Sequence, residues 1–242
     1  MAIIIVSIGI FIVFWSSWQR TPDFEQYAAG IERKTQFFNY FLPLIVQKNK
    51  EIAATRKTLQ KWNESRNNIG WWDSHTLYDL AKQYRVSNFS IEDDTAWIKL
   101  LLNVDVLPPS LVLAQAANES AWGTSRFAKL GNNYFGQWCF EQGCGLVPKK
   151  RDSGKAHEVA AFNSPQESLE SYMQNLNSHP AYQSLRNIRG QLRKDKQPVS
   201  GIALTAGLTS YSERGAQYIE ELGEMIKFNK LEKYDQAVSG IE

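Results

Sequence analysis

A single glutamate, Glu119, lies within a segment that is otherwise suited to burial. Residues 111–121 are apolar except for Gln115, Asn118, Glu119 and Ser120. A carboxyl group in such surroundings must be paired, or must have a raised pKa and stay protonated. A carboxyl that keeps its proton at neutral pH can protonate a departing alkoxide, as cleavage of a glycosidic bond requires. The same spacing also fits a glutamate that points to water from a half-buried helix.

Two neighbours are predicted to share the face of Glu119. Gln115 lies one helical turn before it, and Trp122 lies three residues after it. Residues three and four apart are neighbours on a helix surface. Polar groups and an indole ring are therefore predicted to line one wall of a groove. Pro108 and Pro109 precede this helix, and proline is favoured at the first helical position.

The elements around this helix are predicted to be helical as well. Residues 31–62 carry an apolar residue at every seventh position, although Pro43 should break or kink the helix. Further helices are expected after Ser74, after the segment 90–94, and from Pro165, where Ser164 and Glu167 provide start signals. The last helix should begin near Ser212, with these residues on one face: Tyr218, Ile219, Leu222, Met225 and Ile226.

A small β-hairpin is predicted within residues 145–163. Arg151 to Gly154 gives the turn signal, and segments 147–151 and 157–162 would be the strands. The preceding residues, 131–145, are typical of a loop. The sequence thus predicts a mainly α-helical domain with one hairpin lobe.

Composition limits the classes of function. The 242 residues are enough for one domain plus an appendage, and a net charge of +2 argues against a nucleic-acid binder. Only 3 His and 2 Cys are present, too few for a multi-ligand metal site or a disulfide-dense scaffold. No glycine-rich phosphate loop and no nucleophile elbow occur. We predict neither a metal nor a cofactor.

The first segment is apolar and has no charged side chain before Arg20. Its length lies between a membrane span of about 20 residues and a signal-peptide core of about 7–15. We favour an uncleaved membrane anchor formed by residues 1–19 over a cleaved signal, and over a buried core helix.

A second segment is rich in basic residues: Arg186, Arg189, Arg193, Lys194 and Lys196. We predict that they form a solvated helix face; alternatively, they could bind anionic glycans or lipid headgroups.

Three motifs resemble the glucosaminidase family of peptidoglycan hydrolases, glycoside hydrolase family 73. Residues 114–128, AQAANESAWGTSRFA, are similar to the family's helix A-x-E-S-x-W-G-x-S, whose Glu is the catalytic acid. Residues 131–136 resemble its G-N-N-x-F-G loop, and Tyr211 precedes the last helix where the family has a site tyrosine. The resemblance is closer still to the Bax-type bacterial proteins of this family, which are also similar in segments 138–140, 143–145, 157–159 and 211–215. With them the resemblance extends over residues 31–231.

The resemblance implies a lysozyme-like fold and roles for particular residues. Glu119 would be the general acid, and Tyr211 would steady the sugar or its water from across the cleft. With Gln115 and Trp122, the substrate-binding set would contain Asn133, Tyr134, Phe135 and Trp138.

The second carboxylate is an open question. Several family members carry it on the first hairpin strand, where this chain has Lys149, Lys150 and Arg151. Glu158 is the preferred candidate and Glu141 the next, although Glu158 could instead pair with the basic run. The N-acetyl group of the substrate could also act as the nucleophile.

Cys139 and Cys144 are five positions apart and could be free, disulfide-bonded or zinc ligands. Zinc would need two more ligands, and only His157 is near, more plausibly as a hydrogen-bonding strand residue. A membrane segment and a cell-wall substrate favour the disulfide, which needs an oxidising compartment.

We therefore predict a monomeric bacterial enzyme, anchored in the inner membrane by residues 1–19 and facing the periplasm. A helical extension (20–96) would precede the catalytic domain (97–231) and a tail (232–242). The predicted reaction is cleavage of peptidoglycan strands at the β-1,4 bond after N-acetylglucosamine. Alternatives are a muramidase or lytic transglycosylase, or a non-catalytic wall-binding protein.

Overall fold

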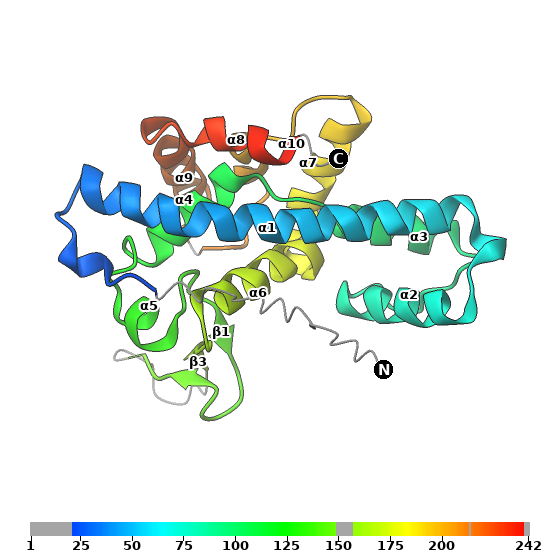
Figure 1. The fold of residues 1–242 in the computed structure, drawn as a ribbon, viewed down its shortest axis with the longest axis horizontal. Helices are drawn as coiled ribbons and strands as arrows, with labels where there is room; N and C mark the ends of the chain where they lie inside the picture. Colours follow the sequence, from blue (N-terminus) through cyan, green and yellow to red (C-terminus); the bar gives the residue numbers. More distant parts are fainter. Residues whose placement is uncertain (1–20, 149–156, 213, 240–242) are drawn as a thin grey trace, which may run out of the picture.

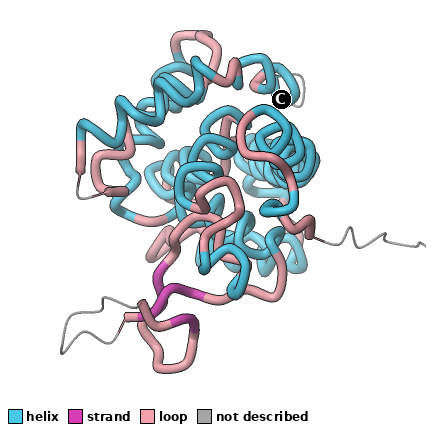
Figure 2. The backbone as a smooth tube through the Cα atoms, turned by 90° about the vertical axis from the view of Figure 1, so that its left-hand side faces the viewer, coloured by secondary structure: helices cyan, strands magenta, loops and turns pink. Residues whose placement is uncertain are grey.

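The structure, a computed structural model, describes residues 21–148, 157–212 and 214–239. The predicted anchor and the predicted hairpin turn, with Lys149, Lys150 and Arg151, lie outside these residues. Within the part that is described, no helix combines the length and the apolar character that crossing a bilayer requires. The chain is mainly helical, and three short strands form a lobe at one end (Figures 1 and 2).

Helix α1 (Ile31–Glu64) is 34 residues long and runs along the whole body (Figure 1). It continues through Pro43, so the predicted break is wrong. One face of α1 is fully buried at Phe37, Phe41 and Ile45, and this packing compensates for the hydrogen bond that proline removes. Ile31, the first residue of the sevenfold pattern, is 87% exposed because α1 only begins there.

Helices α2 (Trp71–Gln83) and α3 (Asp94–Asn103) follow α1. Helix α2 begins at Trp71, three residues before Ser74, and its cap is Gly70 and not the predicted Ser74. Helix α3 begins as predicted, because the Asp93 carboxylate accepts a hydrogen bond from the backbone N–H of Thr95 at 2.8 Å.

Helix α4 (Pro109–Glu119) is the central helix of the body, and its residues from Pro109 to Ala117 are all buried. It contacts α1, α8 (Gly201–Thr205) and α9 (Ala216–Phe228). The Asp235 carboxylate accepts hydrogen bonds from the backbone N–H groups of Ser110 at 2.8 Å and Gly201 at 3.1 Å. The residues that we expected to be a tail therefore cap α4, through a short 3₁₀ turn and α10 (Gln236–Ser239).

The β lobe is a three-stranded antiparallel sheet in the order β1-β3-β2. Its strands are β1 (Trp138–Cys139), β2 (Gly145–Leu146) and β3 (Glu158–Ala160), and the short helix α5 (Arg126–Gly131) precedes them. The hairpin predicted within residues 145–163 is present as the antiparallel pair β2–β3, although its first strand lies at 145–146, before the predicted 147–151. Strand β3 also pairs with β1, which the predicted loop 131–145 contributes.

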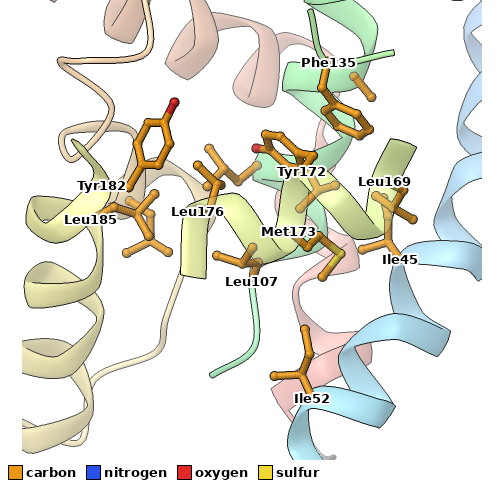
Figure 3. Close-up of a cluster of buried hydrophobic side chains, with 14 of the residues drawn as sticks. Ile45, Ile52, Leu107, Phe135, Leu169, Tyr172, Met173, Leu176, Tyr182 and Leu185 are labelled. Atoms are coloured by element: carbon orange, nitrogen blue, oxygen red, sulfur yellow. The ribbon is translucent and has the colours of Figure 1, made fainter. Parts of the chain in front are cut away.

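Helices α6 (Pro165–Ser178) and α7 (Gln183–Lys194) close the body. The start of α6 is confirmed, because the Ser164 hydroxyl accepts a hydrogen bond from the backbone N–H of Glu167 at 3.1 Å. Figure 3 shows Leu169 and Met173 of α6 directed towards Ile45 of α1. Helix α9 begins four residues after the predicted start at Ser212.

The basic stretch is largely an internal structure, so its prediction as a solvated face was wrong for three of its residues. Arg186 and Arg189 are 1% and 0% exposed, and Arg193 is half-buried. Arg193 donates to Asp105 at 2.7 Å, and Arg189 donates to the side chain of Asn177 at 2.7 Å. Burial alone would raise the pKa of Asp105, but Arg189 and the other arginines around it lower it. Lys194 and Lys196 are exposed.

Candidate active site

Glu119 is the last residue of α4, where the chain reverses its direction. Ala121, Trp122 and Gly123 follow with positive φ angles of 50°, 59° and 79°. The Ser120 hydroxyl accepts a hydrogen bond from the backbone N–H of Gly123 at 2.8 Å and closes this turn. A side chain at Gly123 would collide with the ring of Phe24, 2.3 Å from the position of a Cβ. The helix thus ends at the residue whose chemistry is in question.

The two oxygens of the Glu119 carboxyl have different surroundings. Oε1 accepts hydrogen bonds from the Tyr218 hydroxyl at 2.8 Å and from Nδ2 of Asn118 at 3.3 Å. Oε2 has no hydrogen bond to the residues that the structure describes. It faces Gly136, where a Cβ would lie 3.5 Å away, and Gly136 has φ of +62°. Glycine at this position lets the loop approach the carboxyl closely.

A chain of buried side chains leads to Oε1 of Glu119. The Tyr172 hydroxyl donates to Oε1 of Gln115, whose Nε2 donates to the Tyr218 hydroxyl at 3.0 Å. Tyr218 in turn donates to Glu119. Gln115 is fully buried, so the prediction that it lines a groove is wrong. Instead it orients Tyr218, because its amide must use both ends when water is excluded.

Burial raises the pKa of Glu119, and this outweighs the lowering by Tyr218, Asn118 and the charge of Arg214. The carboxyl therefore keeps its proton to a higher pH than an exposed glutamate does. Burial also raises the pKa of Tyr218 far beyond neutral pH, which makes its hydroxyl a permanent donor. The apolar residues of α4 had predicted this direction for Glu119.

Tyr211 and Phe135 pack against the tyrosines of this chain of side chains and are joined by a hydrogen bond. The Tyr211 hydroxyl donates to the backbone carbonyl of Phe135 at 2.7 Å, and its ring stacks on Tyr218 at 5.5 Å between centroids. The Phe135 ring stacks on Tyr172 at 4.0 Å (Figure 3). The three motifs that the sequence singled out are thus brought together around one carboxyl.

Asn133 and Tyr134 shape this loop from within. The Asn133 amide donates to the carbonyls of Gln137 at 2.9 Å and Ala160 at 2.8 Å. Tyr134 is 2% exposed and packs against Phe24 and Phe41. Neither side chain can reach a glycan directly. Their predicted contact with the substrate is therefore not supported. Both side chains instead stabilise the conformation of the loop.

Trp122 is also turned away from Glu119. Its ring contacts Phe37 at 5.8 Å and Phe38 at 5.4 Å, and Nζ of Lys34 lies 4.8 Å from the ring centroid. The prediction of a shared face assumed that α4 continues to Ala121. Since the helix ends at Glu119, the left-handed turn carries Trp122 onto α1.

Glu158 lies in the β lobe, where it holds the loop closed by the Cys139–Cys144 disulfide. Its Oε1 accepts from the backbone N–H of Gly143 at 3.1 Å, and its Oε2 accepts from Gly145 at 2.8 Å. The Glu158 side chain is 5% exposed, and both of its oxygens accept hydrogen bonds from the loop. This arrangement stabilises the loop and does not favour the predicted catalytic role.

The disulfide itself is confirmed. Both sulfurs are used in it and are not available as zinc ligands. The ring of His157 contacts Trp138 at 4.1 Å between centroids.

A pocket of about 570 Å³ has Gly136 in its wall, the residue that faces Oε2 of Glu119; Glu119 itself does not line it. Around Gly136 the wall consists of Phe135, Tyr172, Tyr182 and Tyr211. Trp138, 53% exposed, lines the same pocket from the β lobe. Of the predicted substrate-binding residues, Phe135 and Trp138 are the ones that border it.

Sequence reasoning missed the tyrosines that organise this site. Tyr218 was assigned only to the apolar face of the last helix, and Tyr172 and Tyr182 were given no role in the site. Their role could have been predicted from hydrogen bonding, because a buried tyrosine hydroxyl needs a partner. Glu119 was predicted to lie in an apolar segment with no donor assigned to it, so a tyrosine of the last helix was a candidate donor.

More than half of the chain matches a known protein family. Residues 94–231 match the glucosaminidase family, described as mannosyl-glycoprotein endo-beta-N-acetylglucosaminidase. The chain belongs to this family. The protein bax of Escherichia coli strain K12 is 37% identical over 212 residues, which cover 86% of this chain and 74% of that protein. The resemblance to Bax-type members is thereby confirmed.

The glucosaminidase domain is similar to a solved structure as well. The crystal structure of the catalytic domain of the autolysin Auto from Listeria monocytogenes aligns with a TM-score of 0.47 and 21% identity. The alignment covers 86% of this chain and 90% of that one. Helices α1 and α2 precede the residues that match the family, yet α1 shares a single hydrophobic core with α4 and α6.

Proposed function

We propose that this protein is a peptidoglycan hydrolase, an endo-β-N-acetylglucosaminidase that cleaves the β-1,4 bond after N-acetylglucosamine. The observation that carries the proposal is the Glu119 carboxyl. It has a raised pKa and one oxygen held by Tyr218, and the other oxygen has no hydrogen bond to the described residues and faces Gly136 in the wall of an aromatic pocket. Membership of the glucosaminidase family supports the class of substrate.

In the proposed reaction, Oε2 of Glu119 gives its proton to the glycosidic oxygen as the bond breaks. The negative charge that develops on the carboxyl is stabilised by the hydrogen bond from Tyr218 to Oε1. Tyr211 and the Phe135 carbonyl would position the sugar at the edge of the pocket. Tyr218 needs no movement during the step, because Gln115 already holds its hydroxyl.

The attack on the sugar carbon needs a second group. The described residues that contact the Glu119 carboxyl, Tyr218, Asn118 and Gly136, include no second carboxylate, and Glu158 is engaged with the disulfide loop. We therefore propose that the carbonyl oxygen of the substrate's N-acetyl group attacks C1 and displaces the leaving sugar. Water then opens the cyclic intermediate, with Glu119 as the base that accepts its proton.

The proposed location follows from the substrate and the disulfide. A disulfide persists in an oxidising compartment, and the bacterial periplasm is one. We propose that residues 1–19 anchor the protein in the inner membrane and that the domain acts as a monomer on the periplasmic side.

The test is to incubate the full chain, in a mild detergent, with purified peptidoglycan, and to reduce the products with borohydride before mass spectrometry. New reduced N-acetylglucosamine ends are expected. Glu119→Gln should abolish them, whereas Glu141→Gln, an exposed carboxyl in the β lobe, should keep them. Muramic or anhydromuramic ends would instead identify a muramidase or lytic transglycosylase. Wall binding without new ends would leave a non-catalytic binding protein.

A further inference from the structure

One wall of the pocket comes from outside the segment that matches the glucosaminidase family. Gln83 and Arg85, at the end of α2, line the same pocket as Tyr211 and Phe135. The Gln83 carbonyl accepts a hydrogen bond from Nε2 of Gln174 at 2.8 Å. The end of α2 is thereby fixed to α6, and the pocket extends from Gly136, which faces the Glu119 carboxyl, to a residue of the N-terminal extension.

Arg85 occupies a backbone position that normally favours glycine. Helix α2 ends in a Schellman motif, with Val86 N–H donating to the Ala81 carbonyl at 2.8 Å and Arg85 N–H to the Lys82 carbonyl at 3.0 Å. Arg85 takes the left-handed conformation at φ +55°. Glycine would adopt it without strain, and strained residues of this kind collect at ligand sites.

Arg85 also supplies the positive charge at this end of the pocket. Its side chain is exposed and has no hydrogen bond or ion pair with the described part of the chain. Burial lowers the pKa of His179, and the charges of Arg85 and Arg186 lower it further. The Arg186 guanidinium is itself buried and donates to the carbonyls of Leu176 and His179, at 2.9 Å each.

We propose that Arg85 binds a carboxylate of the peptide stem that muramic acid carries, so that the enzyme prefers stem-bearing strands to strands without peptides. This inference rests on the proposed function. N-acetylglucosamine alternates with muramic acid in such strands, and the stem branches off beside the sugar that Glu119 attacks. The side-chain amides of Gln83, Gln174 and Asn175 line the pocket and suit a peptide backbone.

The test compares two substrates of equal strand length, one with stems and one from which an amidase has removed them. The denuded strands keep the lactyl carboxylate of muramic acid and lack the carboxylates of the stem. The comparison therefore shows which of these two carboxylates Arg85 binds. We expect Arg85→Gly to lower kcat/KM on stem-bearing strands about fivefold, mainly through KM, and to leave denuded strands unchanged. Arg85→Lys should retain part of the preference.

Lys82→Gln is the matched control, since it removes an exposed positive charge of α2 that does not line the pocket. Lys82→Gln should leave kcat/KM unchanged on both substrates. The melting temperature of Arg85→Gly should not fall, because glycine fits φ +55°. An unchanged preference in Arg85→Gly, or an equal loss on denuded strands, would overturn the stem assignment.

A binding measurement separates this inference from the proposed function. In the Glu119→Gln background, the affinity for a soluble disaccharide-peptide is measured by calorimetry with and without Arg85→Gly. A fivefold weaker Kd supports the inference even where the wild type cleaves neither strand and the proposed function fails. An unaltered Kd rejects it.

Discussion

The replacement Tyr218→Phe tests how the site controls its acid. It removes one oxygen and leaves the ring, which stacks on Tyr211 at 5.5 Å. Two hydrogen bonds meet at that oxygen: one received from Gln115 at 3.0 Å and one donated to Glu119 at 2.8 Å. Their loss should have separate effects on stability and on the pH profile.

The effect on stability comes from Gln115. Its Nε2 is fully buried and loses its acceptor, and an unsatisfied buried donor costs about 1–3 kcal/mol. Glu119 keeps its weaker hydrogen bond from Asn118 at 3.3 Å. We expect the free energy of unfolding, measured by urea denaturation, to fall by about 1–3 kcal/mol.

The effect on activity comes from the carboxyl. The hydrogen bond from Tyr218 lowers the pKa of Glu119, so its removal raises that pKa further above the usual value. General acid catalysis needs the protonated form, so the alkaline limb of kcat/KM should move to higher pH. The carboxylate formed in the reaction is then less stabilised. The plateau rate should fall about tenfold to a hundredfold, the value of one hydrogen bond to a charged group.

Tyr134→Phe is the control. It removes the same hydroxyl from a ring that is 2% exposed and has no hydrogen bond to any described residue from its oxygen. Its pH profile and plateau should match those of the wild type. The reasoning is refuted if folded Tyr218→Phe keeps the alkaline limb of the wild type, or if Tyr134→Phe shifts that limb equally.

Three other changes have clear expectations. Glu119 has a raised pKa in the folded state, so the free energy of unfolding falls as pH rises from the ordinary pKa of an exposed glutamate through that raised pKa. Relative to the wild type, Glu119→Gln should therefore be more stable at pH 8 than at pH 4, measured by urea denaturation. Reduction of Cys139–Cys144 should lower stability by about 2 kcal/mol, and equal melting temperatures with and without reductant would contradict this. Gly136→Ala places a methyl group near Oε2 of Glu119 at φ +62° and should cost about 1–2 kcal/mol and slow cleavage, whereas full activity would show that the approach is not needed.

The parts of the fold that were predictable depend on local signals. The caps at Asp93 and Ser164 are confirmed because each acts within a few residues of its own helix. Glu119 was recognisable because it is the one carboxyl in an apolar segment. The end of α4 was not predictable in this way, since three consecutive positive φ angles depend on contacts with Phe24 and α1.

The errors share one physical cause, which is burial by distant segments. Gln115 and Trp122 lie on or next to α4, but α6, α9 and α1 decide whether they meet solvent. Pro43 is tolerated because the Phe37 face of α1 packs onto the glucosaminidase domain. Arg189 is internal because Asp105 and Asn177 supply buried acceptors. Spacing within one segment contains no information about such partners.

Two groups of contacts therefore position the Glu119 carboxyl, and they have different effects. At the start of α4, Asp235 satisfies the N–H of Ser110 and fixes the helix to the end of the chain. At the end of α4, Tyr218 contacts the carboxyl itself and changes its affinity for a proton. Weakening the first group should leave the pKa of Glu119 unchanged, because Asp235 is not among the groups that shift it. Weakening the second group should change that pKa, so the pH profile separates residues that hold the helix from those that tune its chemistry.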